Sequence, residues 1–254
     1  MQEAHLKISL ITTSYNSAAS IRDTIESVLA QDYENIEYII VDGNSTDHTM
    51  DIVHSYGDQI TRSISEPDEG LYDALNKGIN LAGGDVIGFV HSDDILASRD
   101  VIKNIAKTFS EQKTDSVYGD LLYVHKENTA KTLRYWKAGE FSLRKLKRGW
   151  MPPHPAFYVK KEIYGKYGKF DLNFKIAADY DSILRFLWKY RISTHYLPEI
   201  IVKMRIGGQS NKNIKNILQK SREDIRAMNN NSIQPFPAIL IKNISKIQQF
   251  FKNA

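Results

Sequence analysis

The chain of 254 residues contains no cysteine, which excludes disulfide bonds and thiolate–metal centres. It also lacks a run of about 18 apolar residues, so no transmembrane helix is expected. The N-terminal stretch MQEAHLKISLITTSYN enters a strand-like segment without the features of a signal peptide, and we therefore expect a cytoplasmic protein. Neither a G-x-G-x-x-G nor a Walker pattern occurs, which leaves dinucleotide-binding and P-loop functions without support.

The charge is small overall but unevenly distributed. A net charge of +4 divides into +8 for residues 203–254 and −4 for residues 1–202. A basic C-terminal fifth suggests an anionic partner, such as a membrane surface, an acidic substrate or nucleic acid, although a solvated charged face needs no partner. The tail has no recognisable nucleic-acid-binding module, so we expect no nucleic-acid partner. The composition, 42% hydrophobic and 25% charged, is typical of a packed globular protein.

The first ninety residues alternate between strand-like and helix-like segments. Strands are predicted over 6–13, 36–42, 59–65 and 85–91, and helices over 20–31, 45–56 and 70–82. This alternation predicts an α/β fold with a parallel sheet that is covered on both faces. The second half is more aromatic, with strand-like segments at 115–125, 131–137 and 193–205 and a strong helix at 177–190.

Polar residues follow each of the four predicted parallel strands. The segments are TTSYN, DGNSTD, SEPDEG and HSDD. The carboxyl ends of parallel strands meet at one edge of a sheet, where such folds bind ligands. Asp93 and Asp94 are adjacent there, and like charges so close need a cation or water to absorb them. Carboxylates suit Mg²⁺ or Mn²⁺, with substrate phosphates completing the shell, whereas the simpler interpretation is a solvated turn.

These motifs occur in a fixed order over about 95 residues. The set SLITTSYN, SVLAQ, IIVDGNSTD, NKGI and HSDD, together with the later FDLNFKIAADYDSILRF, resembles the inverting glycosyltransferases of family 2, of the bacterial cell-surface polysaccharide type. The resemblance implies a GT-A fold, which has a Rossmann-like, mostly parallel central sheet with helices on both faces. It also implies a smaller acceptor-side region and C-terminal helices.

The expected organisation has two parts. A glycosyltransferase domain is predicted over 1–212, with a nucleotide-sugar half over about 1–125 and an acceptor half over about 126–212. Residues 213–254 are predicted to form a basic helical extension. Its last part places apolar side chains on one helical face, which predicts either packing on the core or contact with the inner face of the cell membrane.

The resemblance implies that Thr13, Tyr15 and Asp42 contact the nucleotide. An aromatic ring such as that of Tyr15 stacks on a base at low entropic cost, and a carboxylate accepts the imino N–H of uracil or guanine. Asn76 is predicted to face the nucleotide, with a purely helical role as the alternative. Many family members have the sequence DDGS where this chain has DGNS, so Gly43 supplies no second carboxylate and the choice of base stays open.

The resemblance assigns the chemistry to three aspartates. It implies that Asp93 contacts the ribose or sugar, that Asp94 binds the metal, and that Asp179 is the general base that takes a proton from the acceptor hydroxyl. His154 is predicted near the metal or diphosphate, with a structural role as the alternative. Arg205 suits a diphosphate, or else simply ends a strand.

The predicted function is therefore metal-assisted, inverting transfer of a sugar from a nucleotide-diphosphate donor, in surface polysaccharide or glycolipid synthesis. The expected donor is a UDP-sugar, with GDP and dTDP as alternatives, and the expected cofactor is Mn²⁺ or Mg²⁺. The expected acceptor is a saccharide or lipid-linked hydroxyl. Two alternatives stay open. A sugar nucleotidyltransferase is disfavoured because TTSYNSAAS has no Gly, Lys or Arg, and an inactive sugar-nucleotide-binding protein draws its support from Gly43.

Overall fold

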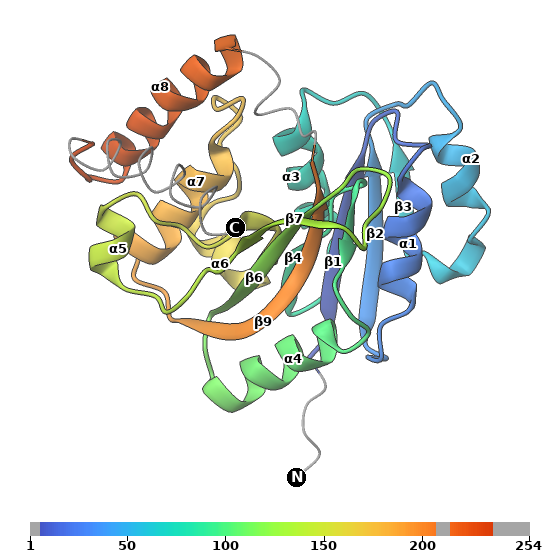
Figure 1. Cartoon of the computed structure of the whole chain (residues 1–254), viewed down its shortest axis with the longest axis horizontal. Coiled ribbons are helices and arrows are strands. Elements are labelled where there is room, and N and C mark those ends of the chain that lie inside the picture. The colour runs from blue at the N-terminus through green and yellow to red at the C-terminus, as the bar shows by residue number, and fades with distance from the viewer. Residues whose placement is uncertain (1–5, 207–213, 236–254) are drawn as a thin grey trace.

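A single mixed sheet of nine strands runs through the molecule (Figure 1). The computed structural model describes residues 6–206 and 214–235. The strands are β1 Ile8–Ser14, β2 Ile36–Asp42, β3 Arg62–Ser65, β4 Val86–Phe89, β5 Asp94–Leu96, β6 Ser116–Val124, β7 Thr132–Trp136, β8 Phe157–Lys160 and β9 Thr194–Arg205. Their order is β3-β2-β1-β4-β8-β6-β9-β5, and β7 pairs with β6.

Helices cover both faces of the sheet. They are α1 Ile21–Leu29, α2 Thr49–His54, α3 Leu71–Leu81, α4 Val101–Gln112, α5 Leu143–Lys147, α6 Lys161–Tyr167, α7 Ala178–Ile183 and α8 Ile214–Asn230, with short turns η1 Gly57–Gln59 and η2 His154–Ala156 and the π-helical segment η3 Leu184–Lys189. The core divides accordingly. One buried cluster joins α1 and α4 to the sheet, and the other joins α3, α6 and α7 to its opposite face.

The first half folds as its pattern predicts. The strands β3, β2, β1 and β4 are mutually parallel, and all seven residues of β1 are buried. A continuous apolar strand of this kind is stable only when both faces are covered. In α1, Ile21, Ile25 and Val28 recur at helical spacing and are buried against the sheet. The α/β fold and its largely parallel core are therefore confirmed.

The second half mixes strand directions. The strand β8 is antiparallel to β4 and β6, whereas β9 is parallel to β6 and antiparallel to β5. The predicted helix over 177–190 is α7 followed by η3, where the helix widens to a π-turn. The predicted strand over 85–91 ends at Phe89, and the separate strand β5 begins at Asp94.

The helix α8 packs against α7 on the side of the molecule away from α1 and α2 (Figure 1). The predicted boundary between residues 212 and 213 is not tested and stays a prediction. The apolar face predicted within 240–251 lies outside the described residues. Among the helices that the structure describes, none combines the length and apolar character needed to cross a membrane.

Candidate active site

Hydrogen bonds tie the loops at the carboxyl ends of β1, β2 and β4 to one another. The Asn16 backbone N–H donates to Ser45 Oγ at 2.8 Å, and Asn16 Oδ1 accepts from the Thr46 N–H at 2.9 Å. The hydroxyls of Ser17 and Ser92 are 2.8 Å apart and hydrogen-bonded. These polar loops therefore converge at one edge of the sheet, as predicted, because parallel strands in register end together.

Asp42 is the buried centre of this edge. It has no exposed surface, and its two carboxylate oxygens accept four hydrogen bonds. Ser14 Oγ and Ser45 Oγ donate to Oδ1 at 2.8 and 2.6 Å, while the Ser45 N–H and Ser65 Oγ donate to Oδ2, both at 2.8 Å. Asp42 therefore holds β1, β2 and β3 together at their ends, and its oxygens are fully used within the protein.

Thr13 is the last residue but one of β1, and Tyr15 directly follows the strand, whose final residue Ser14 pairs with Asp42. Thr13 is buried, whereas Tyr15 is 62% exposed. An exposed aromatic ring at the carboxyl end of a central strand is available for stacking on a flat ligand. Asn76 differs from both, because its amide donates to the Phe170 carbonyl at 2.9 Å and its oxygen accepts from the Phe170 N–H at 3.0 Å. The nucleotide contact proposed for Asn76 stays a prediction, and its visible role is to join α3 to the loop before α7.

Asp94 is the most unusual carboxylate of the chain. It is 1% exposed, and neither of its oxygens has a hydrogen-bond partner in the part of the chain that the structure describes. Burial, and then the charge of the neighbouring Asp93, raise the pKa of Asp94 well above its ordinary value, against the opposing effects of the Arg205 backbone N–H and charge. Among the described residues there is no cluster of three or more His, Cys, Asp or Glu side chains that forms a complete metal cage. Two adjacent carboxylates, one of them unsatisfied, fit a divalent cation that takes its other ligands from phosphate oxygens and water.

Arg205 fixes the turn that carries the two aspartates. This buried side chain donates from Nη1 to the Asp93 carbonyl at 2.9 Å and from Nε to the Lys126 carbonyl at 3.0 Å, and it forms an ion pair with Asp23. The guanidinium is therefore directed to the backbone beneath the aspartates. The diphosphate contact predicted for Arg205 stays a prediction, and a positioning role is what its contacts support.

Asp179 lies in the first turn of α7, with its carboxylate partly exposed. The Tyr72 hydroxyl from α3 donates to Asp179 Oδ1 at 3.1 Å and to the Ile176 carbonyl at 2.7 Å. The other carboxylate oxygen has no donor among the described residues. Asp181, two residues on, instead forms an ion pair with Arg185 one helical turn away, at 3.1 Å.

Two histidines lie between the aspartate turn and Asp179. The His154 ring stacks on Phe89 at 5.4 Å and lies 6.1 Å from the ring of His91. Burial lowers the pKa of His154 to about 4, against the opposing charge of Asp179, so its ring is neutral at pH 7. Burial also lowers the pKa of His91, and the charges of both Asp93 and Asp179 oppose this. Both carboxylates are therefore near enough to His91 to influence its charge. A metal contact by His154 stays a prediction.

Two further features of the site, His91 and a clamp supplied by α8, were not predicted from the sequence. The Glu223 carboxylate accepts hydrogen bonds from three consecutive backbone amides, those of Lys175, Ile176 and Ala177, at 2.8 to 3.1 Å. These amides lie immediately before the helix that carries Asp179. His91 was detectable from its place beside the aspartate pair, but no sequence signal links Glu223 to a loop 46 residues or more away.

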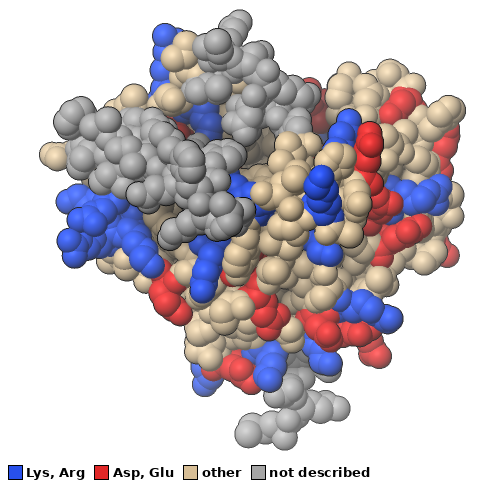
Figure 2. Space-filling model, in the orientation of Figure 1, with Lys and Arg blue, Asp and Glu red and all other residues tan. Residues whose placement is uncertain are grey.

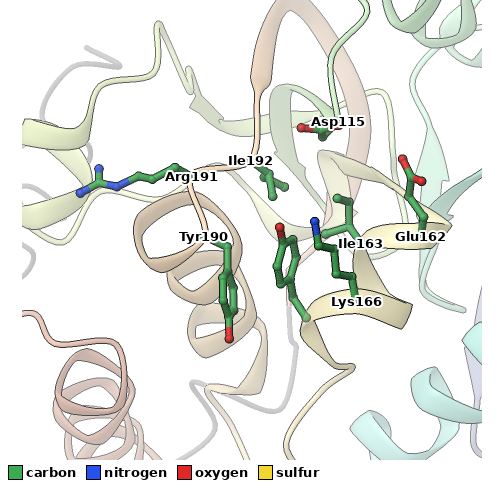
Figure 3. Close-up of a pocket in the computed structure, with 8 residues that line it drawn as sticks. Asp115, Glu162, Ile163, Lys166, Tyr190, Arg191 and Ile192 are labelled. Atoms are coloured by element: carbon green, nitrogen blue, oxygen red, sulfur yellow. The ribbon is translucent and has the colours of Figure 1, made fainter.

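A separate cavity of about 360 Å³ lies away from this site (Figure 3). It is lined by Asp115, Glu162, Ile163, Lys166, Tyr167, Tyr190, Arg191 and Ile192. None of these residues belongs to the strand-end loops or to the Asp179 turn. The candidate active site is instead the open edge between the carboxyl ends of β1–β4 and the start of α7.

Comparison with known proteins gives consistent matches. The family model "Glycosyl transferase family 2" matches residues 9–168. A Mycobacterium bovis protein named PGL/p-HBAD biosynthesis glycosyltransferase is 28% identical over 208 residues, which are 80% of this chain and 78% of that protein.

Two solved structures share the fold. The S. aureus TarS fragment 1–349 in complex with UDP-GlcNAc has a TM-score of 0.66 at 16% identity, covering 96% of this chain and 78% of that one. The Pyrobaculum calidifontis mannosyltransferase PcManGT, in complex with GDP-Man and Mn²⁺, also has a TM-score of 0.66 at 16% identity, covering 98% and 76%.

Proposed function

Because this chain belongs to glycosyl transferase family 2 and is a nucleotide-sugar glycosyltransferase, we propose that it transfers the sugar with inversion at the anomeric carbon. The acceptor oxygen forms the new bond as the bond to the diphosphate breaks, and the diphosphate leaves with the electron pair. A single displacement of this kind inverts the configuration. It requires a general base on the acceptor side and stabilisation of the leaving group on the donor side.

Asp179 supplies the base in this proposal. Its free carboxylate oxygen takes the proton of the acceptor hydroxyl, while Tyr72 holds the other oxygen and so fixes the direction of the carboxylate. The observation that supports the proposal is a chain of ring contacts that begins at His91, two residues before Asp93. The His91 ring lies 6.1 Å from that of His154, and the His154 ring lies 5.5 Å from that of Phe170. Phe170 in turn contacts Tyr72, whose hydroxyl donates to Asp179.

Asp94, with Asp93 beside it, would hold Mn²⁺ or Mg²⁺. The unsatisfied, buried oxygens of Asp94 support this assignment, because such a carboxylate is costly without a cation. When bound with the donor, the ion supplies positive charge at the diphosphate. Arg205 keeps the aspartate turn in place by holding the Asp93 carbonyl, so its role is to position this pair.

The proposed donor is a UDP-sugar, with GDP- and dTDP-sugars as alternatives. The support is that TarS binds UDP-GlcNAc and PcManGT binds GDP-Man, both on the same fold. The proposed acceptor is a saccharide or lipid-linked hydroxyl, in line with the PGL biosynthesis named for the mycobacterial relative.

A basic surface on α5 favours binding of an anionic acceptor or of an anionic membrane surface. Arg144, Lys145, Lys147 and Arg148 are all exposed there, and Figure 2 shows the resulting cluster of Lys and Arg at the place where α5 lies in Figure 1. The membrane contact predicted for the C-terminal helix involves residues outside the described ones and remains part of the proposal.

The test incubates the full chain with Mn²⁺, a panel of UDP-, GDP- and dTDP-sugars, and simple saccharide and lipid-linked acceptors. The expected result is release of one nucleoside diphosphate together with a product whose anomeric configuration, read by NMR, is opposite to that of the donor. A product with retained configuration would contradict the inverting mechanism. Release of pyrophosphate from a nucleoside triphosphate and a sugar phosphate would favour the nucleotidyltransferase alternative.

A further inference from the structure

The sheet edge beside Tyr15, at the ends of β1 and β2, lacks a free carboxylate from β2 that could bind a base. Gly43 stands where DDGS sequences carry their second acid, and the remaining acid, Asp42, already accepts four hydrogen bonds from Ser14, Ser45 and Ser65. Each of its oxygens has two donors, so neither is free to accept another from a base. A base contact at this edge must come from another side chain.

Asp68, in the loop between β3 and α3, fills the place of the missing side chain. A Cβ added to Gly43 would meet Asp68 Oδ2 at 2.5 Å and Asp68 Cγ at 3.2 Å. Gly43 is not among the glycines with positive φ, so its backbone conformation does not require glycine. The lack of a side chain at position 43 instead leaves room for the carboxylate of Asp68.

The Asp68 carboxylate is held in a defined direction. Its Oδ1 accepts the Gly70 N–H at 2.8 Å, which leaves Oδ2 facing Gly43. In the part of the chain that the structure describes, Oδ2 has no hydrogen-bond donor, and the side chain is partly exposed. The Glu66 N–H donates to the Asp42 carbonyl at 3.0 Å, which ties this loop to the end of β2.

Tyr15 completes the edge. The Gly43 N–H donates to the Ser14 carbonyl at 2.8 Å, so Gly43 and the Asp68 carboxylate lie beside the residue that precedes the exposed Tyr15 ring. An exposed aromatic face and an acceptor with free lone pairs are what a planar base with an N–H on its edge requires.

We propose that Asp68 is the base-specificity residue of this chain and that it accepts the imino N–H of a uracil, thymine or guanine base next to Tyr15. The inference rests on the proposed function, since it concerns the donor of the same site. Cytosine has no hydrogen on N3, so its ring nitrogen and the carboxylate repel each other, and the site discriminates against it.

The test measures binding of UDP and CDP to the full chain by titration calorimetry in the presence of Mn²⁺. The wild-type chain is expected to prefer UDP. In Asp68→Asn, UDP binding should weaken about tenfold, the cost of losing one charge-assisted hydrogen bond. The preference for UDP over CDP should also collapse, because the new amide donates to cytosine N3. A purely structural role for Asp68 would weaken both ligands equally.

Two further variants move the carboxylate instead of deleting its charge. Gly43→Ala displaces Asp68 Oδ2, because the side chain must swing away from the new Cβ, and should reduce UDP preference in the same direction. Gly43→Asp combined with Asp68→Ala returns a carboxylate to the vacated space and should restore the preference for UDP over CDP. Glu69→Gln, in the same loop and exposed, is the matched control and should bind as the wild type does.

The outcomes separate this inference from the proposed function. Failure of the wild-type chain to bind any nucleoside diphosphate with Mn²⁺ would overturn the nucleotide-sugar site itself. Tight, metal-dependent UDP binding that persists with unchanged preference over CDP in Asp68→Asn and in Gly43→Ala would overturn the role of Asp68 alone. If Asp68→Asn does not fold, the Gly43→Ala result decides between these readings.

Discussion

The substitution Asp94→Asn should stabilise the metal-free protein while it destroys the metal site. Asp94 is 1% exposed, its oxygens have no hydrogen-bond partners among the described residues, and Asp93 is adjacent in the chain. Without a cation, the folded state therefore bears the cost of burying this carboxylate, either as a charge or by taking up a proton, and Arg205 offsets that cost only in part. Leaving a single charge unpaired in a protein interior costs about 3–5 kcal/mol, and the asparagine amide would still lack partners, so we expect a net gain of about 1–3 kcal/mol.

The assay is thermal unfolding of both proteins in EDTA. For a domain of this size, each kcal/mol corresponds to about 2–4 °C in Tm, so Asp94→Asn should melt higher by a readily measured margin. With Mn²⁺ and UDP at about 100 times the dissociation constant, the wild-type chain should gain about 2.7 kcal/mol and the variant little, which reverses the order. Asp58→Asn, at an exposed position, controls for removal of a negative charge.

Two melting-temperature results would contradict this prediction. If Asp94→Asn melts at or below the wild-type temperature in EDTA, then the carboxylate has a stabilising partner and the reasoning from its burial is wrong. If the order does not reverse with Mn²⁺ and UDP, the site does not use Asp94 to hold the cation.

Three other substitutions follow from the same contacts. Glu223→Gln should lower kcat while leaving UDP affinity unchanged, because it weakens the clamp on the amides before Asp179, and equal kcat in a folded variant would contradict this. Arg205→Met should raise the Kd for UDP with Mn²⁺ and lower stability by about 3 kcal/mol, since a buried network is broken, and chemical denaturation with calorimetry measures both. Burial raises the pKa of Glu37, but hydrogen bonds from Ser9, Gly83 and Lys7 outweigh it and hold the pKa below 4.5. Glu37 therefore stabilises the fold above that pH, and this contribution is lost as the pH falls through the lowered pKa. In Glu37→Gln, the free energy of unfolding should therefore fall less steeply as the pH is lowered. An unchanged dependence on acid pH would refute this prediction.

The parts of the fold that depend on local pattern were predictable. Apolar periodicity located β1 and α1 to within one or two residues, and the rule for parallel strands predicted that the loops after β1, β2 and β4 would converge. The contacts between Asn16 and Ser45 and between Ser17 and Ser92 show that convergence.

Contacts between distant segments were not predictable. Asp94 begins a strand of its own because β5 pairs with β9, whose residues are more than one hundred positions away, and no local signal specifies that partner. The link from Arg205 to the Asp93 carbonyl is equally non-local. Such pairs depend on tertiary packing, so the contacts of Arg205 with two backbone carbonyls and with Asp23 could not be predicted from the sequence.

Internal hydrogen bonds of polar side chains were also not predictable from the sequence. Asn76 suited a nucleotide contact by type and position, but its amide is engaged with the backbone of Phe170. The reverse holds for Asp68, whose position just before α3 is typical of a helix-capping or solvated residue. Its environment becomes visible only when the space beside Gly43 is measured.

The most direct test of the central claim compares donor binding with donor turnover in Asp94→Asn and Asp179→Asn. The claim is that the two aspartates serve one site, Asp94 on the donor side and Asp179 as the base. We expect Asp94→Asn to lose both metal-dependent UDP binding and sugar transfer, and Asp179→Asn to lose transfer while binding UDP as the wild type does. Full transfer by a folded Asp179→Asn protein, or undiminished metal-dependent UDP binding by Asp94→Asn, would contradict the account.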